Sequence, residues 1–127
     1  MGKSSVGIGL LGLGVVGGGV AEYLSVKEKE LRDLTGCSVT LNSVLVRDPG
    51  KDRPFTLSPD LITTDARSVI GNPNVDIVVE LMGGQDPALE HILRSISLRK
   101  HVVTANKEVM ARHGPNILAK AQSNGVQ

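Results

Sequence analysis

Three glycines near the start of the chain have the spacing of a phosphate-binding turn. The pattern G-x-G-x-x-G covers six consecutive positions, which are Gly12, Leu13, Gly14, Val15, Val16 and Gly17. In this pattern the first glycine permits a sharp turn, the second lets a pyrophosphate approach the backbone, and the third lets a helix pack closely on a strand. The free N–H groups and positive dipole end of that helix face the phosphates. These residue types therefore predict a dinucleotide site.

The residues on either side of the glycine pattern decide how strongly it indicates a dinucleotide site. Residues 6–11 form an apolar run of strand length, and apolar side chains recur at roughly helical spacing from Val16 to Leu34. Strand, turn and helix in this order are the context that the pattern requires. A Gly-rich turn without a ligand is the alternative. A secretory signal is disfavoured because each glycine costs about 1 kcal/mol against alanine in a helix.

Arg47 and Asp48 directly follow the second predicted strand. This strand covers residues 39–46 and comes after a helix that is expected to end at Gly36. At this place in a nucleotide-binding unit, an acidic residue binds the ribose 2′-hydroxyl of NAD, whereas an arginine accepts the 2′-phosphate of NADP. Arg47 comes first, and Lys51 and Arg53 follow it. We therefore favour NADP(H) as the cofactor. Asp48 leaves NAD(H) open, and a simple polar strand end is the alternative without a ligand.

The rest of the chain alternates strands and helices. Residues 48–60 read as a proline-rich loop, and Gly114-Pro115 is expected to separate a short helical piece from the last helix. Asp86-Pro87 is expected to open a helix as its N-cap and first-turn proline. Further strands are predicted at residues 61–63, 75–81 and 101–105, helices at 65–70 and after 86, and the start of another strand at 126–127. This alternation predicts an α/β fold with a doubly wound parallel sheet of the Rossmann type.

Composition limits the class of protein further. The chain has 127 residues, a formal net charge of +1 and 40% hydrophobic residues, which suits one globular domain. The near-neutral charge argues against binding to nucleic acid or to a membrane surface. A single cysteine, Cys37, excludes an internal disulfide and suits a reducing compartment. No histidine has a partner at metal-ligand spacing, so no metal site is expected.

Three blocks of the sequence closely resemble the N-terminal cofactor domain of the homoserine dehydrogenase family. They are GLLGLGVVG at 9–17, VDIVVELMGG at 75–84 and HVVTANKE at 101–108. The blocks occur in the family's order and at similar spacing, so the resemblance covers nearly the whole chain. The third block is the most specific of them, because the glycine pattern alone fits many dehydrogenases.

The resemblance implies a set of cofactor-binding residues. Residues 12–17 would hold the pyrophosphate, and Arg47 would face the 2′-phosphate. The nicotinamide-ribose side would be lined by Met82, Gly83 and Gly84. The floor near the reacting carbon would be completed by Thr104, Ala105, Asn106 and Lys107. Lys107 would also assist by steadying the developing negative charge on the substrate carbonyl, the alternative being a solvated lysine in a first helical turn. Glu80 is expected to be structural.

The resemblance also implies a function. The family interconverts L-homoserine and L-aspartate 4-semialdehyde by hydride transfer in threonine and methionine biosynthesis, which implies a cytoplasmic enzyme that is a homodimer at full length. Residues 1–127 are interpreted as its dinucleotide-binding domain, incomplete at the C-terminus. The last strand or strands and the substrate and dimerisation domain, with its proton-transferring lysine, are expected to follow Gln127. No catalytic set is complete here, so the chain alone is expected to bind cofactor without turnover.

Two alternatives and two local consequences accompany this interpretation. The chain could be the nucleotide domain of another amino-acid dehydrogenase, similar to aspartate dehydrogenase, or a non-catalytic dinucleotide-sensing module.

The family ends the helix before His101 with Gly-Lys, whereas this chain has Arg99-Lys100. A left-handed backbone at Arg99 would cost roughly 1–2 kcal/mol. An unpaired sheet edge predicts self-association or poor solubility.

Overall fold

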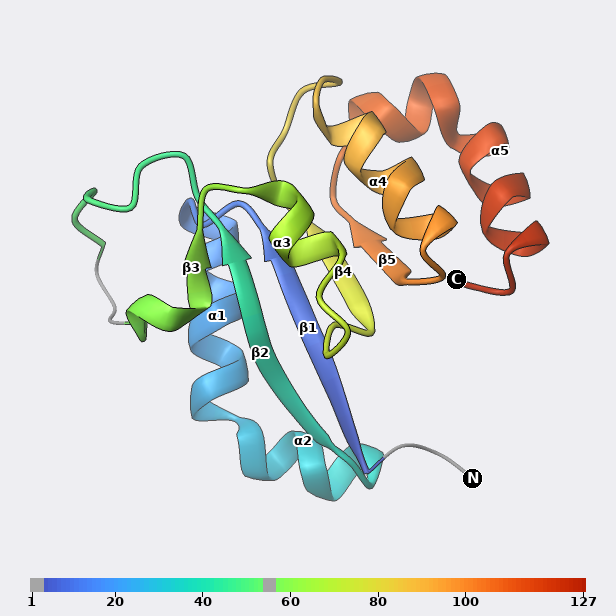
Figure 1. Ribbon diagram of the computed structural model, residues 1–127. Helices are drawn as coiled ribbons and strands as arrows, with labels where there is room; N and C mark the ends of the chain where they lie inside the picture. Colours follow the sequence, from blue (N-terminus) through green and yellow to red (C-terminus); the bar gives the residue numbers. More distant parts are fainter. Residues whose placement is uncertain (1–3, 54–56) are drawn as a thin grey trace.

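One parallel sheet organises the molecule. In the computed structural model, which describes residues 4–53 and 57–127, the strands are β1 (Ser5–Leu11), β2 (Ser38–Leu45), β3 (Ile62–Thr63), β4 (Ile77–Glu80) and β5 (His101–Thr104). Their order in the sheet is β3-β2-β1-β4-β5, and every pairing is parallel (Figure 1). The order reverses between β1 and β4, which confirms the predicted doubly wound α/β fold of the Rossmann type.

Helices cover both faces of the sheet. They are α1 (Val15–Val26), α2 (Glu28–Thr35), α3 (Ala66–Ile70), α4 (Ala88–Ser97) and α5 (Lys107–Ser123), with a short 3-10 helix at Pro59–Leu61. In Figure 1, α1 and α2 lie on one side of the long strands β1 and β2, whereas α3 and α4 lie on the other side and α5 packs beside α4. Within the described ranges, no helix combines the length and apolar character needed to cross a membrane.

Adjacent residues of β1 show that the sheet is buried on both faces. Leu10 and Leu11 are both fully buried, but Leu10 packs in the cluster beneath α1 and Leu11 in the cluster beneath α3. Successive side chains of a strand point to opposite faces, so consecutive apolar residues need a layer of helix on each side. This is why the run at residues 6–11 predicts a central strand.

Two helices differ from their predictions. The first predicted helix is divided at Lys27 into α1 and α2, because α1 buries small residues against the sheet whereas α2 buries none and turns toward the start of β2. The predicted separation at Gly114-Pro115 is wrong, since α5 continues through Pro115. An interior proline costs about 3 kcal/mol, and the buried contacts of Val109, Ile117 and Ala121 in the α4–α5 cluster offset this cost.

Turn residues bound the elements largely as predicted. Gly36 ends α2 in the left-handed conformation, with φ of 76°. Helix α4 begins one residue later than predicted, at Ala88, with Pro87 rather than Asp86 at the N-cap position. Residues 126–127 carry no strand assignment, yet the N–H of Val102 in β5 donates to the carbonyl of Gln127 at 2.9 Å. The chain therefore ends alongside the outer edge of β5.

Candidate functional site

The glycine turn after β1 has the geometry predicted for it. Gly12 has φ of +103°, and its N–H donates to the carbonyl of Leu45 at 3.1 Å. A Cβ on Gly17 would lie 2.2 Å from the carbonyl oxygen of Gly12, so any side chain there would separate α1 from the turn. A Cβ on Gly14 would meet nothing within 4 Å. Gly12 and Gly17 thus form the turn and its packing, while Gly14 faces open space.

The N-terminus of α1 opens onto this space. Gly14 is the N-cap residue, and no side chain caps the first turn. The first N–H groups of a helix have no intrahelical acceptor and carry the positive end of the helix dipole. Val15 is 96% exposed, so its side chain points away from the fold rather than over these groups. The turn therefore leaves backbone donors available to an anion.

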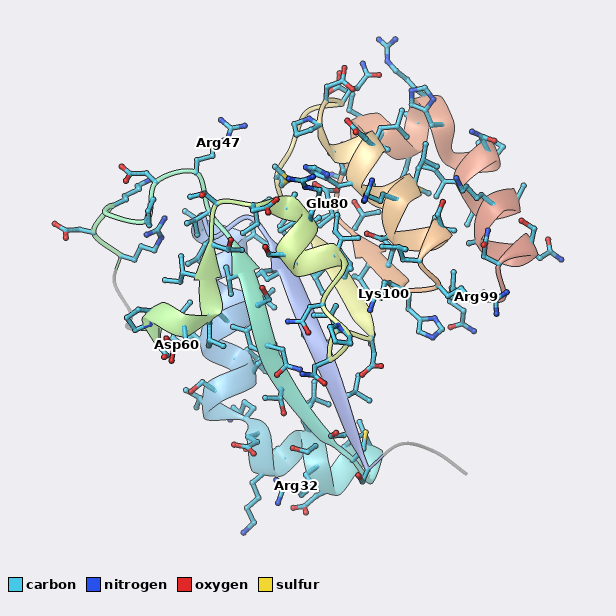
Figure 2. All side chains as sticks on the ribbon, in the orientation of Figure 1. Arg32, Arg47, Asp60, Glu80, Arg99 and Lys100 are labelled. Atoms are coloured by element: carbon cyan, nitrogen blue, oxygen red, sulfur yellow. The ribbon has the colours of Figure 1, made fainter. Side chains whose placement is uncertain are left out.

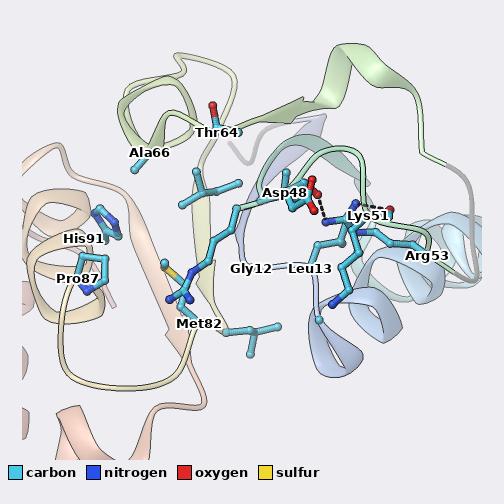
Figure 3. Close-up of a pocket in the computed structure, with 15 residues that line it drawn as sticks. Gly12, Leu13, Asp48, Lys51, Arg53, Thr64, Ala66, Met82, Pro87 and His91 are labelled. Atoms are coloured by element: carbon cyan, nitrogen blue, oxygen red, sulfur yellow. Dashed lines mark hydrogen bonds between the residues drawn. The ribbon is translucent and has the colours of Figure 1, made fainter.

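A cavity of about 640 Å³ lies at the carboxyl ends of β1, β2 and β4. Its size is in the range typical of ligand sites in proteins. Figure 3 shows Asp48, Lys51 and Arg53 on one side of the cavity and Pro87 and His91 on the other. The predicted site residues among its walls are Gly12, Leu13, Gly14, Arg47 and Met82. In an open α/β sheet, ligands bind at this end, where the strand order reverses.

The charged groups of the cavity differ in how they are engaged. Arg53 donates to the carbonyl of Asp48 at 2.8 Å and to that of Lys51 at 3.0 Å, so its guanidinium shapes the loop. The Asp48 carboxylate accepts from the N–H of Gly50 at 2.9 Å. Among the described residues, the side chains of Arg47 and Lys51 have no hydrogen-bond or ion-pair partner. Two cations are therefore free to meet an anionic ligand.

One carboxylate beside the cavity has a perturbed pKa. Asp65 caps α3 between the lining residues Thr64 and Ala66, and it accepts from the N–H of Arg67 at 3.1 Å. This backbone hydrogen bond, aided by the charge of Arg67, lowers the pKa of Asp65 below its ordinary value. The ionised cap stabilises α3 above the unfolded-state pKa, and its contribution is lost as the pH falls through the lowered value.

A smaller cavity of about 200 Å³ adjoins the first, with Leu81 in the wall of both. Of the predicted residues it gathers Val16, Gly83, Ala105 and Asn106. Asn106 also caps α5, because its Oδ1 accepts from the N–H of Val109 at 3.0 Å. The ends of β4 and β5 thus meet beside the start of α1.

Five predicted site residues line neither cavity, namely Val15, Gly17, Gly84, Thr104 and Lys107. Val15 points to solvent and Gly17 lies under the turn, while Gly84 and Thr104 belong to a hydrogen-bond network described below. Lys107 is exposed in the first turn of α5.

The cavity also contains residues that the sequence did not predict as site residues. Thr64 follows β3 directly, so the rule that ligands bind at strand ends could have indicated it. His91 lies in the first turn of α4, and only the fold shows that this turn faces the loop after β2. Within the described ranges, no group of three or more His, Cys, Asp or Glu side chains could hold a metal ion.

The fold and the site together define a dinucleotide-binding domain of the Rossmann class. The family described as homoserine dehydrogenase, NAD binding domain, matches residues 12–127. The chain belongs to this family, whose description names a nicotinamide dinucleotide as the cofactor.

Full-length relatives agree with this assignment. The homoserine dehydrogenase of Bacillus subtilis is 40% identical over 95% of the chain, and that of Synechocystis is 44% identical over 96%. The crystal structure of a homoserine dehydrogenase from Thiobacillus denitrificans superposes with a TM-score of 0.88, at 41% identity and 96% coverage. The chain spans 28% of the length of each of these three proteins.

Proposed function

We propose that this chain is the part of a homoserine dehydrogenase that binds NADP(H). The observation that carries this proposal is Arg47 at the carboxyl end of β2, whose side chain has no partner within residues 4–53 and 57–127 and which lies in the wall of the cavity that contains the glycine turn. A 2′-phosphate is the group that distinguishes NADP from NAD, and a free guanidinium at this strand end is its expected partner. Lys51, which also has no side-chain partner in the part of the chain that the structure describes, adds a second cation to the same wall.

The residues present fit a dinucleotide. Gly12, Gly14 and the uncapped first turn of α1 would hold the pyrophosphate, and Arg47 the 2′-phosphate. The nicotinamide half would lie toward the carboxyl ends of β4 and β5, beside Met82, Gly83, Gly84, Thr104, Ala105, Asn106 and Lys107. When bound, the reduced cofactor supplies a hydride to the carbonyl carbon of L-aspartate 4-semialdehyde.

Lys107 is the residue of this chain best suited to assist that reaction. A cation in the first turn of a helix is opposed by the helix dipole, so nothing in α5 itself favours a lysine there. Placed beside the reacting carbonyl, its ammonium would stabilise negative charge that develops on the oxygen. The proton that the oxygen then needs must come from another group, which we assign to the substrate region of the longer relatives.

For the whole enzyme we propose the family's reaction, the interconversion of L-homoserine and L-aspartate 4-semialdehyde in the biosynthesis of threonine and methionine. We further propose that the full-length protein is a cytoplasmic homodimer. The relatives are more than three times as long as the chain, and we assign the remaining catalytic groups to their other parts. The chain alone is therefore proposed to bind the cofactor without turnover.

Titration of the chain with NADPH and NADH, followed by nicotinamide fluorescence, tests this proposal. A hydrogen bond to a charged group contributes about 1.5–3 kcal/mol, so NADPH is expected to bind roughly ten- to a hundredfold more tightly than NADH. No oxidation of NADPH is expected when L-aspartate 4-semialdehyde is added. Tighter binding of NADH would overturn the NADP preference, failure to bind either cofactor would overturn the binding function, and turnover would overturn the division of catalytic groups.

A further inference from the structure

A fully buried carboxylate stands at the carboxyl end of β4. Glu80 is the last residue of this strand, is 0% exposed and contributes to the wall of the smaller cavity. Within the described ranges, no lysine, arginine or histidine forms an ion pair with it. Burying a carboxyl group without a cation is unfavourable unless its oxygens are hydrogen-bonded. The hydrogen-bond partners of Glu80 therefore indicate what the buried side chain does.

Both oxygens of Glu80 act as acceptors. Oε2 accepts from the N–H of Met82 at 2.8 Å, and Oε1 lies 2.5 Å from the hydroxyl of Thr104. The same hydroxyl oxygen accepts from the N–H of Asn106 at 3.0 Å. Because no other acceptor for the hydroxyl proton is found among the described residues, that proton is directed to Glu80. Glu80 therefore joins the end of β4 to the end of β5 through both of its side-chain oxygens.

Asn106 closes the network into a ring. Its Nδ2 donates to the carbonyl of Gly84 at 2.5 Å, while its Oδ1 caps α5. The residues between Met82 and Gly84 are thus held at both ends, although Gly83 and Gly84 have positive φ and little packing of their own. Polar networks of this kind fix a single arrangement because a buried donor or acceptor without a partner is costly.

The ring holds one half of the proposed site and not the other. It fixes the residues after β4 and β5, to which the nicotinamide half is assigned. None of its hydrogen bonds involves Arg47, Lys51 or the glycine turn, and Met82 is its one contact with the wall of the larger cavity. A change in the ring should therefore act on the nicotinamide half alone.

From these contacts we infer that Glu80 is a positioning residue for the nicotinamide half of the cofactor, acting through Thr104, Asn106 and the backbone of Met82. This inference rests on the proposed NADP(H) binding and deepens it. Glu80 fixes the shape of the smaller cavity before the cofactor arrives, so its contribution appears in the binding of the whole dinucleotide. The adenosine fragment 2′,5′-ADP, which lacks the nicotinamide half, does not depend on Glu80.

Glu80→Gln tests this inference, because it keeps the shape of the side chain and replaces one acceptor with a donor. Affinities for NADPH and for 2′,5′-ADP are measured on the wild-type chain and the variant. We expect NADPH binding to weaken roughly tenfold, with 2′,5′-ADP binding unchanged. The emission of bound NADPH should also shift toward that of free NADPH. Thr104→Val, which removes the hydroxyl that bonds to Glu80 and to the N–H of Asn106, should reproduce the result and replaces Glu80→Gln if that variant does not fold.

Ile117→Val is the matched control for lost stability, since it trims a buried side chain of α5 outside both cavities. It should leave both affinities unchanged. Equal weakening of NADPH and 2′,5′-ADP in Glu80→Gln would show a general structural role and overturn the inference, as would an unchanged NADPH affinity. Failure of the wild-type chain to bind 2′,5′-ADP would instead overturn the proposed function.

Discussion

Arg47 and Asp48 leave the same strand end, yet their side chains differ in availability. The carbonyl of Asp48 accepts from Arg53 and its Oδ1 accepts from the N–H of Gly50, so one of its two carboxylate oxygens is used within its own loop. Arg47 has no partner within the described ranges, lines the cavity, and is exposed, with its side chain pointing away from the fold (Figure 2). An acidic residue that contacts a ribose must keep an oxygen available for it, and Oδ2 of Asp48 has no partner within the described ranges. Arg47 is therefore the ground for proposing NADP(H), whereas Asp48 leaves NAD(H) open.

Replacing Arg47 with alanine separates the two cofactors. In Arg47→Ala we expect NADPH affinity to fall roughly ten- to a hundredfold, and NADH affinity to change little because NADH has no 2′-phosphate. Fluorescence titration measures both. Arg32→Ala is the matched control, because it removes the same charge from the opposite end of the molecule (Figure 2) and from an exposed ion pair of small energetic value. Equal losses for the two cofactors in Arg47→Ala would contradict the assignment.

Single residues were predictable from the sequence where a backbone requirement leaves one choice. Gly12 needs a positive φ and Gly17 has no room for a Cβ, so the glycine pattern indicated both. The position of Glu80 at the end of an apolar strand indicated a structural residue, but not its partners. Those partners come from β5 and the loop after β4, and only the paired strands bring them together. His91 was not predicted as a site residue for the same reason, because only the fold brings it to the cavity.

Elements were predictable where local pattern and packing agree. The strands follow from their apolar runs, and α2 ends at Gly36 as the turn chemistry requires. Pro115 misled the prediction because local propensity was outweighed by the burial of Val109, Ile117 and Ala121 in the contact of α5 with α4. That contact joins segments far apart in the sequence, so no local pattern could show it.

Arg99 joins α4 to β5 in a conformation that favours glycine. Its φ is 60°, the left-handed backbone whose cost was considered when Arg99-Lys100 was compared with Gly-Lys, and the N–H of Lys100 donates to the carbonyl of Ser95 at 2.9 Å across the helix end. A left-handed residue other than glycine costs roughly 1–2 kcal/mol. Replacing Arg99 with glycine would remove this cost. Part of the stability gained would be lost again, because glycine makes the unfolded chain more flexible.

Arg99→Gly should therefore raise the free energy of unfolding by about 0.5–1 kcal/mol, measured by urea denaturation. Ser97→Gly provides the contrast, since it places a glycine two residues earlier, inside α4, where the backbone is helical. It should lower the same free energy by roughly 0.5–1 kcal/mol. A loss of stability in Arg99→Gly would show that the arginine side chain contributes more than its backbone costs.

At the scale of the whole molecule, the two edges of the sheet are unequal. β3 forms one edge and has two residues, too few to template another strand. β5 forms the other edge, and among the described residues only the short segment at 126–127 lies beside it. Val103 of β5 is 56% exposed, so this edge also presents an apolar side chain. Unprotected edges of this kind pair with other chains.

The chain is therefore expected to self-associate through β5, so that its mass, measured by light scattering, increases with concentration. Val103→Lys should shift the population toward the monomer, because a charge on an edge strand opposes pairing with another copy. Leu118→Lys introduces the same charge at an exposed apolar residue of α5 away from that edge, and it should leave the association unchanged. A wild-type chain that stays monomeric at every concentration would show that residues 126–127 already protect β5, and an equal effect of both lysines would assign the association to general apolar exposure.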